Sequence, residues 1–190
     1  MANVSRINGF TPVRHLFGSP YMGQVTMYGV DATDATILAV GDMVKLDGNA
    51  TTEGRRCVTR ATVSAAVLGP VVGFVIDPTN LNTPQTRAAL TARYVFVADD
   101  PNLVFECQAN ATCTASIVGL NCDLTIAAAS TITGASAMQA DISTTNTTAT
   151  IVLKIIEVVQ RADNAIGTSN RLLVMINNHQ LKASTGSVGV

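Results

Sequence analysis

Glycine, proline, aspartate and asparagine divide most of the chain into short segments rich in β-branched residues. This spacing of turn residues restricts the fold more than any other feature. The segments fall at 24–30, 39–46, 57–63, 67–76, 93–99, 151–161 and 171–177. Such runs bounded by turn residues indicate strands. The run 151–161 is apolar on both faces, which is typical of a central strand covered on both sides. We therefore expect a mainly β protein, with a small β-barrel or β-sandwich-like domain.

Residues 1–24 follow a different pattern and predict an extended, irregular N-terminal arm. Gly9, Pro12, Gly18 and Pro20 would interrupt a helix here. Burial of the arm's apolar side chains cannot by itself offset the entropy lost when its backbone is ordered. The arm therefore needs backbone hydrogen bonds, either from its own domain or from an adjacent subunit that it clasps.

Residues 25–181 read as one β-rich domain, and the change in composition allows a subdivision near residue 105. Residues 86–90 favour a single helical turn. Residues 182–190 form a small-residue tail that we expect to be mobile or docked on another surface. The sequence shows no exact internal repeat and no clear linker.

Charge and hydropathy exclude several classes of protein. Twelve Lys and Arg against thirteen Asp and Glu give a net charge of −1, which argues against nucleic acid as a partner. No apolar run reaches the ~20 residues of a membrane helix, so we expect no membrane partner. Charged residues make up 13% of the chain, about half the usual ~25%. Such a weakly polar surface favours association with other subunits.

Four cysteines, Cys57, Cys107, Cys113 and Cys122, are expected to be buried free thiols. The N-terminus lacks the charged-then-apolar order of a signal peptide, so we expect synthesis in the cytoplasm, where thiols stay reduced. Their spacing lacks the C-x2-C pair of a zinc site, and we expect neither metal nor cofactor.

Signatures of catalysis are also missing from the sequence. It contains no phosphate-binding glycine loop, no nucleophile elbow and no metalloprotease motif. His15 and His179 have no carboxylate at a helical spacing, and Asp99 and Asp100 precede Pro101, which indicates a turn. We expect that the protein is not an enzyme.

The apolar side chains of the arm and of the following segment are the best candidates for contact with other subunits. The methionines among them would be adaptable interface anchors, although core packing is equally compatible with their positions. The candidate interface residues are Phe10, Val13, Leu16, Phe17, Tyr21, Met22 and Met27.

Several blocks resemble the head decoration, or capsid cement, proteins of tailed bacteriophages. The blocks are VGDMVKLDG (40–48), VLGPVVGFVIDP (67–78), ARYVFVADDPNLVFE (92–106) and NRLLVMINNHQL (170–181), together with the opening MANVSRINGFTPVRHLFGSPY. A Gly-Asp-x-Val strand and a Leu-Gly-x-Val-x-Gly strand recur in the small β-barrel-like unit of such proteins. They stand here at 41–44 and 68–73.

The resemblance implies a structural virion protein on the outer capsid surface, made in the host bacterial cytoplasm. It implies binding at junctions between major capsid protein subunits, and stabilisation of the expanded head against the pressure of packaged DNA. It also implies self-association as a dimer or trimer. A tail-tube or head–tail connector subunit is the alternative. A carbohydrate-binding virion module is less well supported, because the chain has no Trp and few other aromatic residues to stack on sugars.

Overall fold

The computed structural model describes residues 3–82, 84–130, 132–182 and 186–189. It is mainly β, with 41% strand and 2% helix, which confirms the predicted fold class. The helical part of these ranges is one short 3-10 turn, η1 (Ala115–Ile117). Within the described residues no helix is long and apolar enough to cross a membrane.

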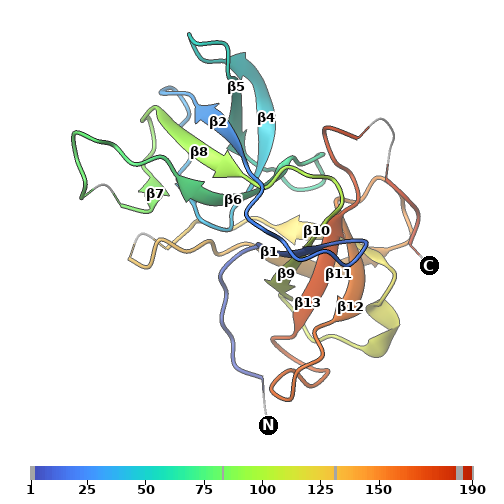
Figure 1. Ribbon diagram of the computed structural model, residues 1–190. Coiled ribbons are helices and arrows are strands. Elements are labelled where there is room, and N and C mark those ends of the chain that lie inside the picture. Colours follow the sequence, from blue (N-terminus) through green and yellow to red (C-terminus); the bar gives the residue numbers. More distant parts are fainter. Residues whose placement is uncertain (1–2, 83, 131, 183–185, 190) are drawn as a thin grey trace.

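The first half of the chain forms a closed five-stranded barrel, here called barrel 1, in the upper part of Figure 1. Its strands are β2 (Thr26–Val30), β4 (Met43–Ala50), β5 (Arg56–Arg60), β6 (Gly69–Phe74) and β8 (Arg93–Val97). The short strands β3 (Leu38–Ala39) and β7 (Thr86–Arg87) pair with each other beside it. Barrel 1 has its own core, which includes Tyr28, Leu68 and Val95.

The second half of the chain, together with β1 from the N-terminal arm, forms a six-stranded sheet in the order β1-β9-β13-β12-β10-β11. These strands are β1 (Thr11–His15), β9 (Leu103–Gln108), β10 (Asn121–Thr125), β11 (Gln139–Asn146), β12 (Leu153–Val158) and β13 (Arg171–Ile176). The sheet curls until Ala109, just after β9, meets Ala140 of β11 in a parallel bridge. The five strands β9 to β13 thus nearly close into a second barrel, called barrel 2, and β1 lies outside it along β9.

The two barrels have the same topology. In each, the first strand in sequence pairs antiparallel with the fifth, the fifth with the fourth, the fourth with the second, and the second with the third. The third strand then meets the chain of the first through one parallel pair. This pair is Gly29 with Cys57 in barrel 1, and Ala109 with Ala140 in barrel 2. The chain is therefore a structural duplication.

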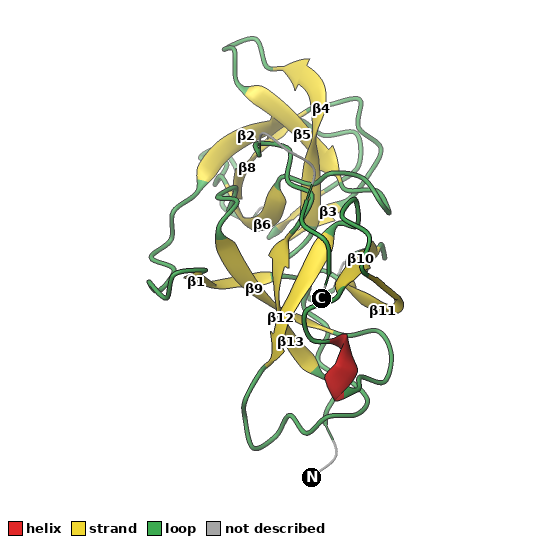
Figure 2. Cartoon of the chain, turned by 90° about the vertical axis from the view of Figure 1, so that its right-hand side faces the viewer, coloured by secondary structure: helices red, strands yellow, loops and turns green. Residues whose placement is uncertain are grey.

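Main-chain hydrogen bonds join the two barrels firmly. The Val67 N–H donates to the Asn178 carbonyl at 3.1 Å, and the Gln180 N–H donates back to Val67 at 2.9 Å. The core of barrel 2 also takes in Met43, Val67 and other apolar residues that belong to the chain of barrel 1. Because a shared core resists hinge motion, the barrels form one unit (Figure 2).

The N-terminal arm differs from the expected irregular segment. Residues 11–15 form β1, which pairs antiparallel with β9 of the same chain, from Thr11 opposite Glu106 to His15 opposite Leu103. Just before β1, the Phe10 N–H donates to the Gly41 carbonyl at 3.0 Å. Gly9 makes this approach possible, because a Cβ there would lie 2.3 Å from the Gly41 oxygen. The arm supplies a strand and a core side chain to its own fold.

Two further expectations changed at the local level. The segment 39–46 is split between β3 and β4, because Gly41 adopts a φ of +90° between them. The predicted helical turn at 86–90 is wrong. Thr86 and Arg87 belong to β7, and the Arg87 side chain is fully buried. Its guanidinium donates to the carbonyls of Asp31, Thr36 and Thr91, and these contacts fix the chain in an extended form.

The described part of the C-terminal tail docks on barrel 2. The Ser187 N–H donates to Asn177 Oδ1 at 2.7 Å, and the Asn121 amide donates to the Ser187 carbonyl at 2.8 Å. The Gly189 N–H donates to the Thr147 carbonyl at 3.0 Å. Residues 183–185 and 190 of the tail, like residues 1–2 of the arm, lie outside the described residues.

Candidate protein-binding surface

The structure divides the seven predicted interface residues into three groups. Phe10 is 1% exposed and belongs to the core of barrel 2, so it is not available to a neighbouring subunit. Tyr21 and Met27 are half-buried. The remaining four side chains are exposed on one hairpin that spans residues 11–22. These four, here called the apolar tip, are Val13, Leu16, Phe17 and Met22.

Local hydrogen bonds define the hairpin that carries the apolar tip. After β1 the chain turns back, and the His15 N–H donates to the Ser19 carbonyl at 2.8 Å. The Tyr21 N–H donates to the Val13 carbonyl at 3.1 Å. Gly18 adopts a φ of +94° at the turn. Residues with a side chain rarely adopt this left-handed conformation, whereas glycine adopts it readily. The hairpin projects from the body of the molecule at the left of Figure 2.

Contacts to the rest of the fold hold this hairpin in place. The Leu16 N–H donates to the Asn102 carbonyl at 2.8 Å. His15 Nδ1 lies 3.3 Å from Asp100 Oδ2, and Arg14 lies 3.6 Å from Glu157. The His15–Asp100 pair was not predictable from spacing, because the turn after β8 brings the carboxylate to β1 from 85 positions along the chain. The tip is apolar and its base is polar.

Phe17 and Met22 are the most exposed of the seven candidate side chains. Their side chains are 87% and 76% exposed on a hairpin whose backbone is already ordered. Complete burial of either side chain against a partner would contribute roughly 1.5–3 kcal/mol. Because the backbone is hydrogen-bonded before binding, little further ordering entropy opposes that gain. The arrangement suits the docking of another protein.

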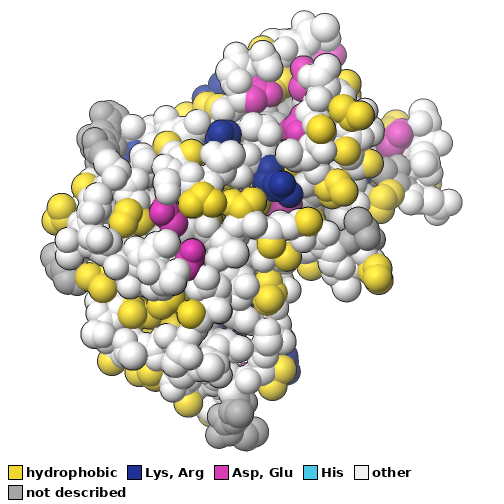
Figure 3. Space-filling view, turned by 180° about the vertical axis from the view of Figure 1, so that it is seen from behind, with side chains coloured by type: hydrophobic (Ala, Val, Ile, Leu, Met, Phe, Trp, Pro, Cys, Tyr) yellow, Lys and Arg dark blue, Asp and Glu magenta, His cyan; other side chains and the backbone are white. Residues whose placement is uncertain are grey.

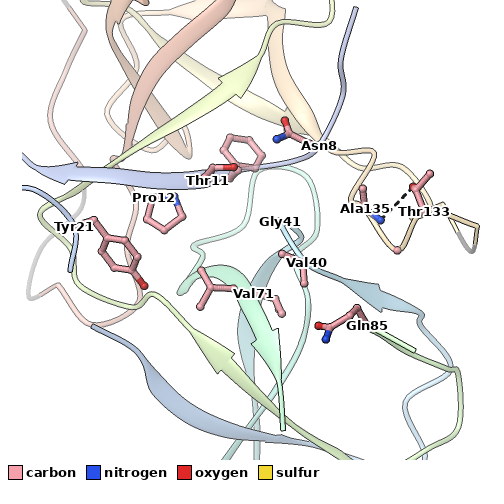
Figure 4. Close-up of a pocket in the computed structure, with 13 residues that line it drawn as sticks. Asn8, Thr11, Pro12, Tyr21, Val40, Gly41, Val71, Gln85, Thr133 and Ala135 are labelled. Atoms are coloured by element: carbon pink, nitrogen blue, oxygen red, sulfur yellow. Dashed lines mark hydrogen bonds between the residues drawn. The ribbon is translucent and has the colours of Figure 1, made fainter. Parts of the chain in front are cut away.

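An apolar groove of about 480 Å³ lies next to the hairpin, between the two barrels (Figure 4). Its lining includes Pro12 and Tyr21 of the hairpin, Val71 of β6, and Val40 from the chain between β3 and β4. Burial raises the pKa of Tyr21, which is the one ionisable side chain among the described residues of this lining. The groove offers apolar contacts and backbone amides rather than acid–base groups.

The wider surface carries few charges, and those seen on the far side in Figure 3 are mostly separated by uncharged side chains. An uncharged surface can be covered by another protein with little loss of ionic hydration. This agrees with the low charge content of the sequence.

Burial sets the chemical state of the cysteines and of one histidine. All four cysteines are buried and free, as predicted. Burial raises the pKa of Cys107 to about 12 and that of Cys113 to about 11, which disfavours the nucleophilic thiolate. His179 is buried, and its Nδ1 accepts the Leu181 N–H at 3.0 Å. Across the described ranges, no three His, Cys, Asp or Glu side chains gather in a way that could hold a metal ion.

No family model matches the chain, and neither the curated proteins nor the solved structures include a significant match to it.

Proposed function

We propose that this protein is a structural component of a phage virion that binds the outside of the head and reinforces junctions between major capsid protein subunits. The observation that carries the proposal is the ordered hairpin with its apolar tip, above all Phe17 at 87% exposure. It is accompanied by the resemblance of the sequence blocks to decoration proteins.

The double barrel suits a mechanical role. Load applied across a β ladder is shared by many hydrogen bonds, and the barrels are joined by a common core rather than by a linker. A site of this kind need not bind tightly on its own. Many copies on one shell, linked to each other or through the lattice, add their weak contacts as avidity.

The test is addition of the purified chain to expanded heads of the encoding phage that lack it. We expect saturable occupancy of the outer surface and a higher melting temperature of the shell. Absence of both binding and thermal shift would refute the proposal. Electron microscopy of the purified protein tests the alternative of a tail-tube or connector subunit, which predicts that the protein assembles into rings or tubes.

Single-residue variants test the role of the apolar tip. Phe17→Ser and Met22→Ser should reduce occupancy of the heads without altering the melting temperature of the free chain. Leu81→Ser is the matched control, because Leu81 is 79% exposed on a loop of barrel 1. That loop lies at the far left of Figure 1, away from the hairpin near the centre of the view. Equal losses in all three variants would show that the tip has no special role.

A further inference from the structure

Three arginines meet in one small pocket at the end of barrel 2 where β9 ends and β13 begins. The pocket, here called the arginine pocket, has a volume of about 290 Å³. Arg6 comes from the N-terminal arm, Arg161 from the loop after β12, and Arg171 from the start of β13. The arm begins beside this loop at the bottom of Figure 1. The chain has twelve Lys and Arg residues among 190, so this one pocket gathers three of its twelve cationic side chains.

The carboxylates beside the arginine pocket do not saturate its guanidinium groups. Glu106 Oε1 lies 2.9 Å from Arg171 Nε and 3.4 Å from Arg161 Nη1, so one oxygen serves two arginines. Asp163 Oδ1 lies 3.3 Å from Arg161 Nε. Among the described residues, the Arg6 side chain has no hydrogen bond or ion pair. Two carboxylates therefore balance three guanidinium groups, each of which carries five N–H donors.

Hydrogen bonds between the walls of the pocket order its backbone before any ligand binds. The Asn3 side-chain amide donates to the carbonyls of Ala165 and Thr168, both at 2.7 Å, and so ties the arm to the loop after β12. Arg171 Nη1 donates to the Arg6 carbonyl at 3.1 Å. A ligand would therefore meet arginines whose backbone positions are already fixed, which lowers the entropy cost of binding.

Ser169 also lines the pocket, and its backbone conformation is unusual. Its φ is +54°, in the left-handed region that residues with a side chain seldom adopt. Residues in strained conformations of this kind cluster at ligand-binding and active sites, where the surrounding structure holds them. The Ser169 hydroxyl has no hydrogen-bond partner among the described residues, so it is a further free donor in the pocket.

We propose that the arginine pocket binds an oxyanion, a carboxylate or a phosphate group, through the donors of Arg6, Arg161 and Ser169. Arginine suits this ligand because its planar guanidinium donates two parallel hydrogen bonds to two oxygens of one group. Arg171, which is held by Glu106 and by the arm, positions the other groups. The oxyanion comes either from an acidic side chain of another protein or from a free phosphate ion.

The position of the pocket relates the carboxylate source to the proposed function. Arg171 pairs with Gln108 at one end of β9, whereas His15 of the hairpin pairs with Leu103 at the other end. A carboxylate of the capsid protein in the pocket would give the chain a second contact with the head, away from the apolar tip. That source rests on the proposed function, whereas binding of free phosphate does not.

Calorimetric titration of the purified chain with inorganic phosphate, at constant ionic strength, tests the free-ion source. If phosphate binds, Arg6→Gln should weaken its binding by at least about tenfold, because a charged double donor is lost. Arg55→Gln is the matched control, because Arg55 is likewise exposed but lies in barrel 1. It should leave phosphate binding unchanged. Both variants should melt close to wild type, since both side chains are exposed.

Attachment of the same two variants to expanded heads tests the carboxylate source. If the capsid protein supplies the carboxylate, Arg6→Gln should raise the apparent dissociation constant for the heads by at least about tenfold, while Arg55→Gln should not. Added salt should weaken wild-type attachment more than that of Arg6→Gln, because salt screens the lost ionic contact.

The two measurements together decide the proposal. A loss with Arg6→Gln in the phosphate titration identifies a free ion as ligand, and a loss in attachment to heads identifies a capsid carboxylate. A chain that shows neither loss, or that Arg6→Gln and Arg55→Gln weaken equally, overturns the proposal. If the wild-type chain does not attach to heads at all, the proposed function fails, and the phosphate titration alone decides whether the pocket binds an oxyanion.

Discussion

Two phenylalanines seven positions apart should respond in opposite ways to the same substitution. Phe10 is 1% exposed in the core of barrel 2, and Phe17 is 87% exposed at the hairpin. Phe10→Ala removes a buried ring and leaves a cavity, which costs about 3–5 kcal/mol of unfolding free energy. Phe17→Ala removes no buried contact and should stay within about 0.5 kcal/mol of wild type.

Thermal and urea unfolding of the isolated chain measure this difference. At this chain length each kcal/mol lowers Tm by roughly 2–4 °C, so Phe10→Ala should lower Tm by roughly 6–20 °C. Phe17→Ala should shift Tm by no more than about 2 °C. Both variants replace Phe by Ala within the same segment, so a difference in Tm between them reflects the position of the ring and not the kind of substitution. A Phe10→Ala variant as stable as Phe17→Ala would mean that the arm leaves its own core in solution.

Three further predictions concern buried polar and thiol groups. Arg87→Lys cannot reproduce three guanidinium bonds to backbone carbonyls and should cost about 3–5 kcal/mol in urea unfolding; a loss below about 1 kcal/mol would contradict this. Burial raises the pKa of Asp42 above its ordinary value of 3.8, so its contribution to stability is full below that pH and is lost as the pH rises through the folded-state pKa. Asp42→Asn keeps an acceptor for the Ala39 N–H. In thermal melts across this pH range, the stability of the variant relative to wild type should increase as the pH rises. A stability difference that does not change with pH would contradict the predicted direction. Because the cysteines are free, reductant should leave the melting curve unchanged, and a drop of several degrees would indicate a disulfide.

The sequence determined the β class and the position of most strands. Segments such as 93–99 and 171–177 were found because alternating and β-branched residues between turn residues suit a pleated backbone, whatever they pair with. The turn at Asp99 and Asp100 could also be predicted from the sequence. Asp100 Oδ1 accepts the Asn102 N–H at 2.8 Å, an interaction made within three residues. Local chemistry was sufficient in each case.

Contact of the candidate residues with another subunit stays a prediction, but the exposure of four of them agrees with it. Val13, Leu16, Phe17 and Met22 stood out as apolar residues in a segment unsuited to a helix, and they are exposed. Phe10 could not be distinguished from them in the sequence, because its burial depends on which distant residues the fold places around it. Here it brings Gly41 and the core of barrel 2.

Tertiary structure decided the features on which the proposals rest. β1 pairs with a strand about ninety positions away, and the closing pairs of both barrels join segments that no sequence spacing connects. The duplication is invisible in the sequence because the two halves share hydrogen-bond connectivity rather than side chains. Backbone pairing is set by which strands meet in space, whereas local propensity fixes only that strands will form. The apolar segments could be located in the sequence, but which of their side chains are covered follows from long-range pairing alone.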